Sequence, residues 1–156
     1  MASQFKNRDD FTLFYTDTDS IDINKPLEPK FVGKELGKMK LELVFDRILF
    51  LAPKVYSGIT SSNKITKVKG YKIKDKFTGK TNNIDLEKLL PLLNKNEKLE
   101  LHQDKWHRYF SKGYIEIKDE IYTLIVTDNK RKIIYDSNNK FIDTKPINIY
   151  NEEIID

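Results

Sequence analysis

Cysteine is absent from the 156-residue chain, which excludes both a disulfide framework and a thiolate metal site. The only two histidines, His102 and His107, have no other obvious ligands near them in the sequence, which argues against a histidine zinc site. No apolar run approaches the roughly 20 residues needed to cross a bilayer, so we expect no membrane partner. Residues 1–10 also lack the apolar segment of a secretory signal.

Alanine and arginine are scarce: alanine occurs twice, and four of the 28 basic residues are arginine. Lysine, asparagine, isoleucine and tyrosine, which are frequent instead, are encoded by A/T-rich codons, so we expect an A/T-rich genome such as that of an organelle or its plasmid. A hydrophobic share of 38% and an aromatic share of 12% predict a folded chain of one domain or two small subdomains. The net charge of +4 modestly favours a phosphate-bearing partner.

The first half of the chain reads as short antiparallel strands. Two β-prone runs, Phe11–Tyr15 and Ser20–Asn24, flank a Thr/Asp-rich turn and predict a β-hairpin. A short helix is expected from Pro29 through Leu36, where Gly37 ends it. Alternating or β-prone runs predict four further strands, at Lys38–Leu43, Ile48–Leu51, Val55–Ile59 and Ile65–Tyr71, the middle two paired across Pro53.

The second half combines short helices with a β-meander. Residues 75–83 are polar and predict a linker, after which Asp85 can cap a helix that Pro91 shortens or kinks. A second helix is expected over Asp104–Lys112. Turns at 118–120, 128–130 and 137–139 separate four expected strands, 114–117, 121–127, 132–135 and 141–149. The fold class expected for the whole chain is therefore α+β.

The candidate chemistry lies at the hairpin tip, where Asp17 and Asp19 stand two residues apart. If the backbone there is extended, both carboxylates point to one face while Thr18 points away. Two converging carboxylates repel each other unless a cation lies between them, and oxygen ligands of this kind suit Mg²⁺. A bare Asp-x-Asp is more often a turn that caps its own backbone, so the surrounding sequence has to decide between the two interpretations.

That surrounding sequence carries several motifs in a recognisable order. Tyr15–Ser20, with the letters Y-T-D-T-D-S, resembles motif C of family B DNA polymerases. Leu51–Tyr56 resembles the K-x-Y motif of the same family, and Lys67–Gly70 resembles the lysine-glycine segment that follows it. Gly33–Glu42 is similar to the stretch between motif C and the K-x-Y motif. Order and spacing agree over Phe11–Lys72. Thr16 stands where motif C usually has a smaller residue, a variant that resembles the protein-primed branch of the family. Two tail segments, at 127–131 and 134–136, resemble the thumb of polymerases encoded by fungal mitochondrial linear plasmids.

The resemblance implies a fold and a set of roles. Residues 1–75 would be the C-terminal part of the polymerase palm, an antiparallel hairpin and strands, and 76–156 a thumb of short helices and a β-meander. Asp19 would be a direct catalytic ligand of Mg²⁺, with Asp17 beside it. The positions expected on the nucleotide side are Tyr15 and Thr18, and those expected on primer-template DNA are Lys54, Tyr56, Lys69 and Gly70. A mitochondrial location follows from the same resemblance.

Other polymerase motifs are not found in these residues. The D-x-x-S-L-Y-P-like motif that supplies the second palm carboxylate is missing, as are the K-x-x-x-N-S-x-Y-G fingers helix and an exonuclease carboxylate set. A two-metal site would be complete only with those palm residues. We therefore expect the C-terminal portion of a DNA polymerase, inactive without an N-terminal portion. The alternative is a noncatalytic nucleic-acid-binding module.

Two further patterns remain open at this point. On an extended strand, Lys67 and Lys69 would share one face, and Lys72, Lys74 and Lys76 would share the other. Either face could follow the backbone of a nucleic-acid duplex, or the lysines could serve to discourage pairing with another strand. An aromatic cluster, comprising Trp106, His107, Tyr109 and Phe110, could stack on bases, but its expected place on a short helix favours core packing.

Overall fold

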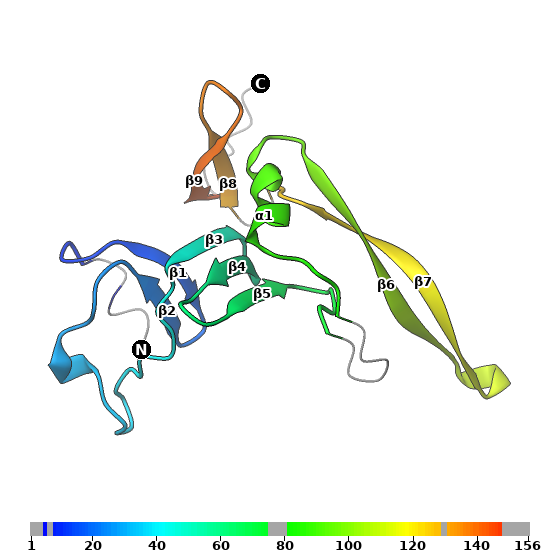
Figure 1. The fold of residues 1–156 in the computed structure, drawn as a ribbon, viewed down its shortest axis with the longest axis horizontal. Coiled ribbons are helices and arrows are strands. Elements are labelled where there is room, and N and C mark those ends of the chain that lie inside the picture. Colours follow the sequence, from blue (N-terminus) through cyan, green and yellow to red (C-terminus); the bar gives the residue numbers. More distant parts are fainter. Residues whose placement is uncertain (1–4, 6–7, 75–80, 129–130, 148–156) are drawn as a thin grey trace, which may run out of the picture. The chain divides into compact units, whose positions relative to one another are not determined.

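A computed structural model describes residues 5, 8–74, 81–128 and 131–147. The chain forms two compact units, Met1–Lys69 and Gly70–Asp156. Figure 1 traces the elements of both units along the sequence. Strands dominate and helices are few and short, so the expected α+β class is only loosely consistent with the fold. The assignment of 1–75 to a palm and 76–156 to a thumb stays a prediction.

The first unit opens with the expected hairpin. Strand β1 (Leu13–Asp17) pairs antiparallel with β2 (Ser20–Ile23), and Asp17 lies opposite Ser20. Only two residues therefore make the turn, and the first of them, Thr18, has a φ of 56°. A positive φ at this position is a feature of the primed turns whose twist matches that of tight hairpins. The predicted hairpin is confirmed.

A three-stranded sheet completes this unit. Its strand order is β3 (Arg47–Ala52), β4 (Val55–Ile59) and β5 (Lys64–Val68), all antiparallel. Pro53 and Lys54 form the turn between β3 and β4, because proline supplies the fixed φ of the first turn position. The core side chains of this sheet are Leu51, Val55, Val68 and, as a buried polar group, Ser57, whose hydroxyl bonds that of Thr66. The predicted pairing across Pro53 is confirmed.

The segment between hairpin and sheet departs from the prediction. The expected helix shrinks to one 3₁₀ turn, η2 (Pro29–Phe31), and no strand forms over Lys38–Leu43. Met39 makes only an isolated bridge, to Val32. Alternation gives a strand only when one face is buried, and here Leu41 is 70% exposed.

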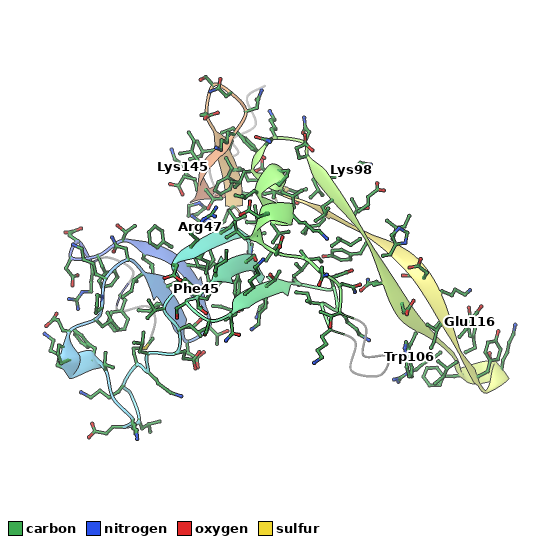
Figure 2. The ribbon with its side chains drawn as sticks, in the orientation of Figure 1. Phe45, Arg47, Lys98, Trp106, Glu116 and Lys145 are labelled. Atoms are coloured by element: carbon green, nitrogen blue, oxygen red, sulfur yellow. The ribbon has the colours of Figure 1, made fainter. Side chains whose placement is uncertain are left out.

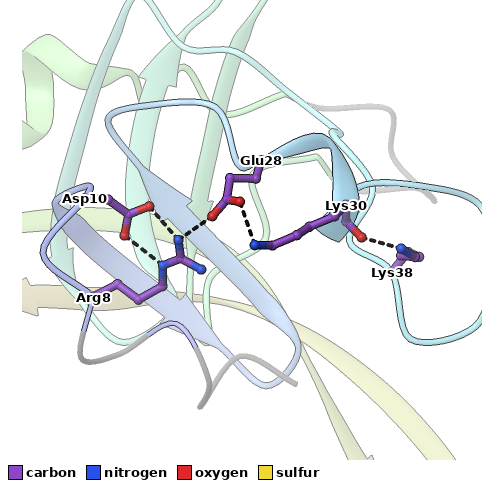
Figure 3. A network of polar contacts seen from close by, with 5 residues as sticks. All are labelled: Arg8, Asp10, Glu28, Lys30 and Lys38. Carbon is purple, nitrogen blue, oxygen red and sulfur yellow. Dashed lines mark hydrogen bonds and ion pairs between the residues drawn. The ribbon is translucent and has the colours of Figure 1, made fainter.

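A polar network ties the start of the hairpin to η2, as Figure 3 shows. The guanidinium of Arg8 donates to both oxygens of Asp10, at 2.7 Å each, and to Glu28 at 2.8 Å, and Lys30 pairs with the other oxygen of Glu28 at 2.7 Å. The bond to Arg8 lowers the pKa of Asp10, and those to Lys30 and Arg8 lower the pKa of Glu28. The guanidinium also lies 5.2 Å from the ring centre of Phe31.

The second unit begins with the expected capped helix. Asp85 accepts a bond from the backbone N–H of Lys88 and so caps α1 (Leu86–Leu89), which passes directly into the 3₁₀ turn η3 (Leu90–Leu93). Pro91 lies in that turn, which agrees with the prediction that it shortens the helix. Three leucines of this segment are buried in the core of the unit, namely Leu86, Leu89 and Leu92.

A long two-stranded ribbon replaces one predicted helix and one predicted turn, and the strands predicted at 114–117 and 121–127 become parts of a single strand. Strands β6 (Lys98–Tyr109) and β7 (Tyr114–Ile125) pair over their full twelve residues and meet at the 3₁₀ turn η4 (Phe110–Lys112) (Figure 1). The helix expected over Asp104–Lys112 is wrong, and so is the turn expected at 118–120. Figure 2 shows Trp106 and Glu116 on the part of the ribbon nearer to η4.

Cross-strand pairing explains both errors. Glu120 accepts from Lys105 at 2.9 Å and lies 2.6 Å from His107, and His102 lies 3.0 Å from Asp119. Polar residues that suggest a turn when read one after another lie within paired strands, and their side chains contact diagonal positions, since Lys118 lies directly opposite Lys105 and Asp119 opposite Asp104. The bond from Lys105, followed by that from His107, lowers the pKa of Glu120.

The last pair of strands follows the prediction. Strand β8 (Arg131–Tyr135) pairs antiparallel with β9 (Phe141–Pro146), and the carboxylate of Asp136 accepts bonds from the N–H groups of Asn138 and Lys140 in the turn. The end of the second expected strand, at residues 148–149, lies outside the described residues. Of the predicted 75–83 linker, only residues 81–83 lie within the described part of the chain.

Gly58 gives a test of the first unit's packing. A Cβ added there would lie 2.5 Å from the ring of Phe45, so we expect Gly58→Ala to destabilise the unit by about 1–3 kcal/mol. The urea midpoint of unfolding measures the effect. Gly33→Ala is the matched control, because its Cβ would meet only the flexible side chain of Lys38 at 3.3 Å. Equal losses in the two variants would contradict the packing described for Gly58.

Candidate functional site

The hairpin tip holds the two aspartates in different local environments. Asp17 ends β1, whereas Asp19 is the second residue of the turn. The hydroxyl of Thr18 donates to a carboxylate oxygen of Asp17 at 3.3 Å, and the hydroxyl of Ser20 donates to the Asp17 carbonyl at 3.1 Å. The positive φ of Thr18 means that the extended backbone assumed for Asp17 and Asp19 is not present there. Their two carboxylates are therefore not related by the simple alternation of a strand.

Lys54 reaches this tip from the turn between β3 and β4. Its ammonium lies 3.1 Å from a carboxylate oxygen of Asp17. Its backbone N–H donates to the hydroxyl of Tyr15 at 2.8 Å, and its carbonyl accepts from the N–H of Lys69 at 3.0 Å. Residues far apart in the sequence thus meet at one place, with Lys54 at its centre.

Three aromatic rings support the contact between hairpin and sheet. The rings of Tyr15 and Phe50 are stacked, with centres 4.9 Å apart and planes 5° from parallel. The ring of Tyr56 lies 5.9 Å from each of the other two, tilted by 56° and 53°. Phe50 and Tyr56 are direct cross-strand partners in the β3–β4 pair. Offset or tilted aromatic pairs of this kind contribute about 0.5–1.5 kcal/mol each beyond the area they bury.

Packing, more than charge, holds this arrangement together. The side chains of Lys54 and Asp17 are 58% and 35% exposed, and exposed ion pairs contribute only about 0–1 kcal/mol. The bond between the Lys54 N–H and the Tyr15 hydroxyl contributes a similar amount. The ammonium of Lys54 is consequently free to exchange one anionic partner for another at small energetic cost.

Asp22 is a further carboxylate on this side of the hairpin. It lies opposite Tyr15 in the β1–β2 pair, so the two side chains share a face of the sheet. Burial raises the pKa of Asp22 above its ordinary value of 3.8. No sequence pattern singles out this residue.

The structure brings most of the predicted site residues together. Tyr15, Asp17, Lys54 and Tyr56 lie in one cluster, and Thr18 and Asp19 form the turn beside Asp17. Lys69 joins the cluster through its bond to Lys54. Gly70 begins the second unit, where its φ of 80° favours glycine. Phe50 was missed, although the predicted pairing across Pro53 would have placed it opposite Tyr56.

The donor set at the tip fits a hard divalent cation only in part. Mg²⁺ is commonly held by one or two carboxylates together with substrate phosphates, a role open to Asp17 and Asp19. In the described part of the chain, no group of three or more His, Asp or Glu side chains could hold a metal ion. The two aspartates would therefore need oxygen ligands from elsewhere, and metal binding here stays a prediction.

The remaining sequence candidates have mixed outcomes. Strand β5 ends at Val68, so Lys69, Lys72 and Lys74 do not continue an extended strand as predicted, and Lys76 lies outside the described residues. Three members of the aromatic cluster lie on strand β6, and the fourth, Phe110, begins η4. Core packing is wrong for Trp106 and Phe110, which are 36% and 86% exposed, and neither His107 nor Tyr109 is buried. Among the residues that the structure describes, no helix is long and apolar enough to cross a membrane.

Comparison with known proteins identifies relatives in fungi. A protein of Ascobolus immersus named probable DNA polymerase is 34% identical over 156 aligned residues, which include 92% of the chain. Proteins with the same name from Podospora anserina and Neurospora intermedia are 37% and 35% identical and match 87% and 75% of the chain. The chain is homologous to one part of these proteins. It spans 12% of the length of each. Neither a protein-family model nor a solved structure matches it.

The half-buried Asp22 leads to a prediction on stability. Because its pKa is raised in the folded chain, the unfolded chain ionises first as the pH increases, and the free energy of unfolding falls as the pH rises above about 3.8. We expect Asp22→Asn to raise the melting temperature at pH 7 and to lose this advantage below pH 3.8. Asp9→Asn, which removes the same charge from an exposed side chain, is the control. An unchanged or lower melting temperature at pH 7 would contradict the effect of burial.

Proposed function

We propose that this chain is the C-terminal portion, palm end and thumb, of a family B DNA polymerase of the protein-primed kind. Its part in the reaction is to help hold the primer end and the catalytic magnesium during template-directed nucleotidyl transfer. The partners proposed are primer-template DNA, deoxynucleoside triphosphates and an N-terminal polymerase portion. An organellar or plasmid origin in the mitochondrion is proposed with it, supported by the amino-acid composition and the fungal relatives.

The observation that supports this function best is the meeting of two separated motifs. The Tyr15–Ser20 hairpin and the K-x-Y turn contact each other through the Lys54–Asp17 ion pair and the bond from Lys54 to Tyr15. In a polymerase, the acidic hairpin tip has to lie beside the residues that hold the primer, here called the primer grip and proposed to be Lys54 and Tyr56. The reason is that the reacting 3′ end of the primer lies between them. The names of the fungal relatives point to the same function.

Each side chain would contribute a simple physical property. Lys54 provides a point charge for a primer phosphate, and Tyr56 provides a flat face and a hydroxyl. Asp19 and Asp17 would supply carboxylate oxygens to Mg²⁺, whose chemistry is to stabilise charge on the attacking and leaving oxygens. Tyr15 and Thr18 are proposed on the nucleotide side, and Lys69 and Gly70 along the DNA.

Duplex binding by the isolated chain tests the primer grip. We expect the 156-residue chain to bind a labelled primer-template duplex in fluorescence anisotropy, with an affinity that falls as salt rises. Lys54→Gln should weaken binding about tenfold, the value of one charge-assisted hydrogen bond. Lys40→Gln removes an equal charge from an exposed loop and should have little effect. Equal effects of both substitutions would argue for unspecific attraction to a basic surface.

Primer extension tests the catalytic part of the proposal. A chimera in which this chain replaces the matching segment of the Podospora anserina protein should extend a primer in Mg²⁺, whereas the chain alone should not. Asp19→Asn in the chimera should reduce extension at least about a hundredfold, a loss typical of removing a key electrostatic group. Asp9→Asn is the control. Extension by the chimera that survives Asp19→Asn would refute the assigned role, and a chimera that binds duplex but does not extend the primer would favour the noncatalytic binding module.

A further inference from the structure

Lys54 has a backbone conformation that lysine rarely adopts. Its φ is 62°, in the left-handed region. Lys54 is the second central residue of the turn between β3 and β4, and Pro53 is the first. Glycine or asparagine is the usual residue at such a position, and other side chains there cost about 1–2 kcal/mol. A strained residue of this kind persists only where its surroundings hold it.

Two contacts within the first unit hold the backbone of Lys54. The Tyr15 hydroxyl accepts its N–H at 2.8 Å, and the N–H of Lys69 binds its carbonyl at 3.0 Å. The ammonium is then directed to the hairpin tip, 3.1 Å from Asp17. The direction of the charge therefore depends on the place of the Tyr15 hydroxyl.

Phe50 packs against the ring that carries that hydroxyl. Its ring is nearly parallel to that of Tyr15 and 4.9 Å away, and it also contacts the Tyr56 ring across the β3–β4 pair. The β1–β2 hairpin and the three-stranded sheet are separate sheets, so their alignment at this point depends on side chains rather than on a backbone ladder. The contacts run in sequence from Phe50 to Tyr15 and from Tyr15 to the backbone of Lys54.

We propose that Phe50 is a positioning residue for DNA binding, which acts through the Tyr15 hydroxyl to hold the strained Lys54 turn and aim its ammonium. Phe50 itself touches no DNA. The consequence for DNA binding rests on the proposed function, whereas the effect on Lys54 does not. The role for the Tyr15 hydroxyl is separate from any contact of the Tyr15 ring with a nucleotide.

Amide measurements on the free chain test the structural step. In ¹⁵N-labelled protein, Phe50→Leu, which removes the ring, should shift the Lys54 amide resonance and accelerate its hydrogen exchange at least about tenfold. Tyr15→Phe keeps the stack but removes the acceptor, so it should have the same effect on that amide. Phe50→Tyr keeps an aromatic ring and should restore wild-type values. Unchanged hydrogen-exchange rates of the paired β4 and β5 amides show that the sheet remains folded.

A double-mutant cycle on duplex affinity tests the functional step. Phe50→Leu should weaken duplex binding by about threefold to tenfold when Lys54 is present and have almost no effect in a Lys54→Gln background. A merely structural loss would instead weaken binding by the same factor in both backgrounds and would overturn the proposal. So would a Lys54 amide that Phe50→Leu leaves unchanged. If the wild-type chain binds no duplex, the proposed function fails, and the amide measurements alone decide the positioning role.

Discussion

The contact between Tyr15 and the Lys54 turn is the interaction on which the candidate site depends. The hairpin and the three-stranded sheet of the first unit have no shared ladder, so side chains alone bring the acidic tip next to the lysine. The Tyr15 hydroxyl satisfies the N–H of Lys54 and the Tyr15 ring stacks on Phe50, so Tyr15 links the two sheets through two contacts. Without this link, Asp17 and Lys54 would be only exposed charges that attract each other weakly.

The local strain at the site is consistent with a functional role. Two residues of the cluster have a positive φ although they are not glycine, Thr18 beside Asp17 and Lys54 opposite it. Each costs free energy that a purely structural turn would avoid with glycine or asparagine. Under the proposed function, this strain would hold Lys54 and the hairpin tip in place for DNA.

Secondary structure was predicted correctly from the sequence where a local pattern is compatible with only one kind of element. The Tyr15–Ser20 hairpin, the strands around Pro53 and the Asp85 cap each combine a turn or cap residue with flanking apolar runs, and all three form. The ribbon was missed because residues 104–112 mix charged with aromatic residues and residues 118–120 are all charged, and only pairing between distant segments makes them strands. Phe50 was missed for a related reason. Its importance comes from a contact with Tyr15 in another sheet, which no local pattern contains.

The most direct test of the account is an NMR titration of the ¹⁵N-labelled chain with a primer-template duplex. If the hairpin tip and the K-x-Y turn form one DNA-directed site, the amides of Asp17, Lys54 and Tyr56 should shift together, with one common dissociation constant. Shifts confined to the β6–β7 ribbon, or separate constants for the hairpin and the turn, would contradict the claim that these two motifs work as a single site.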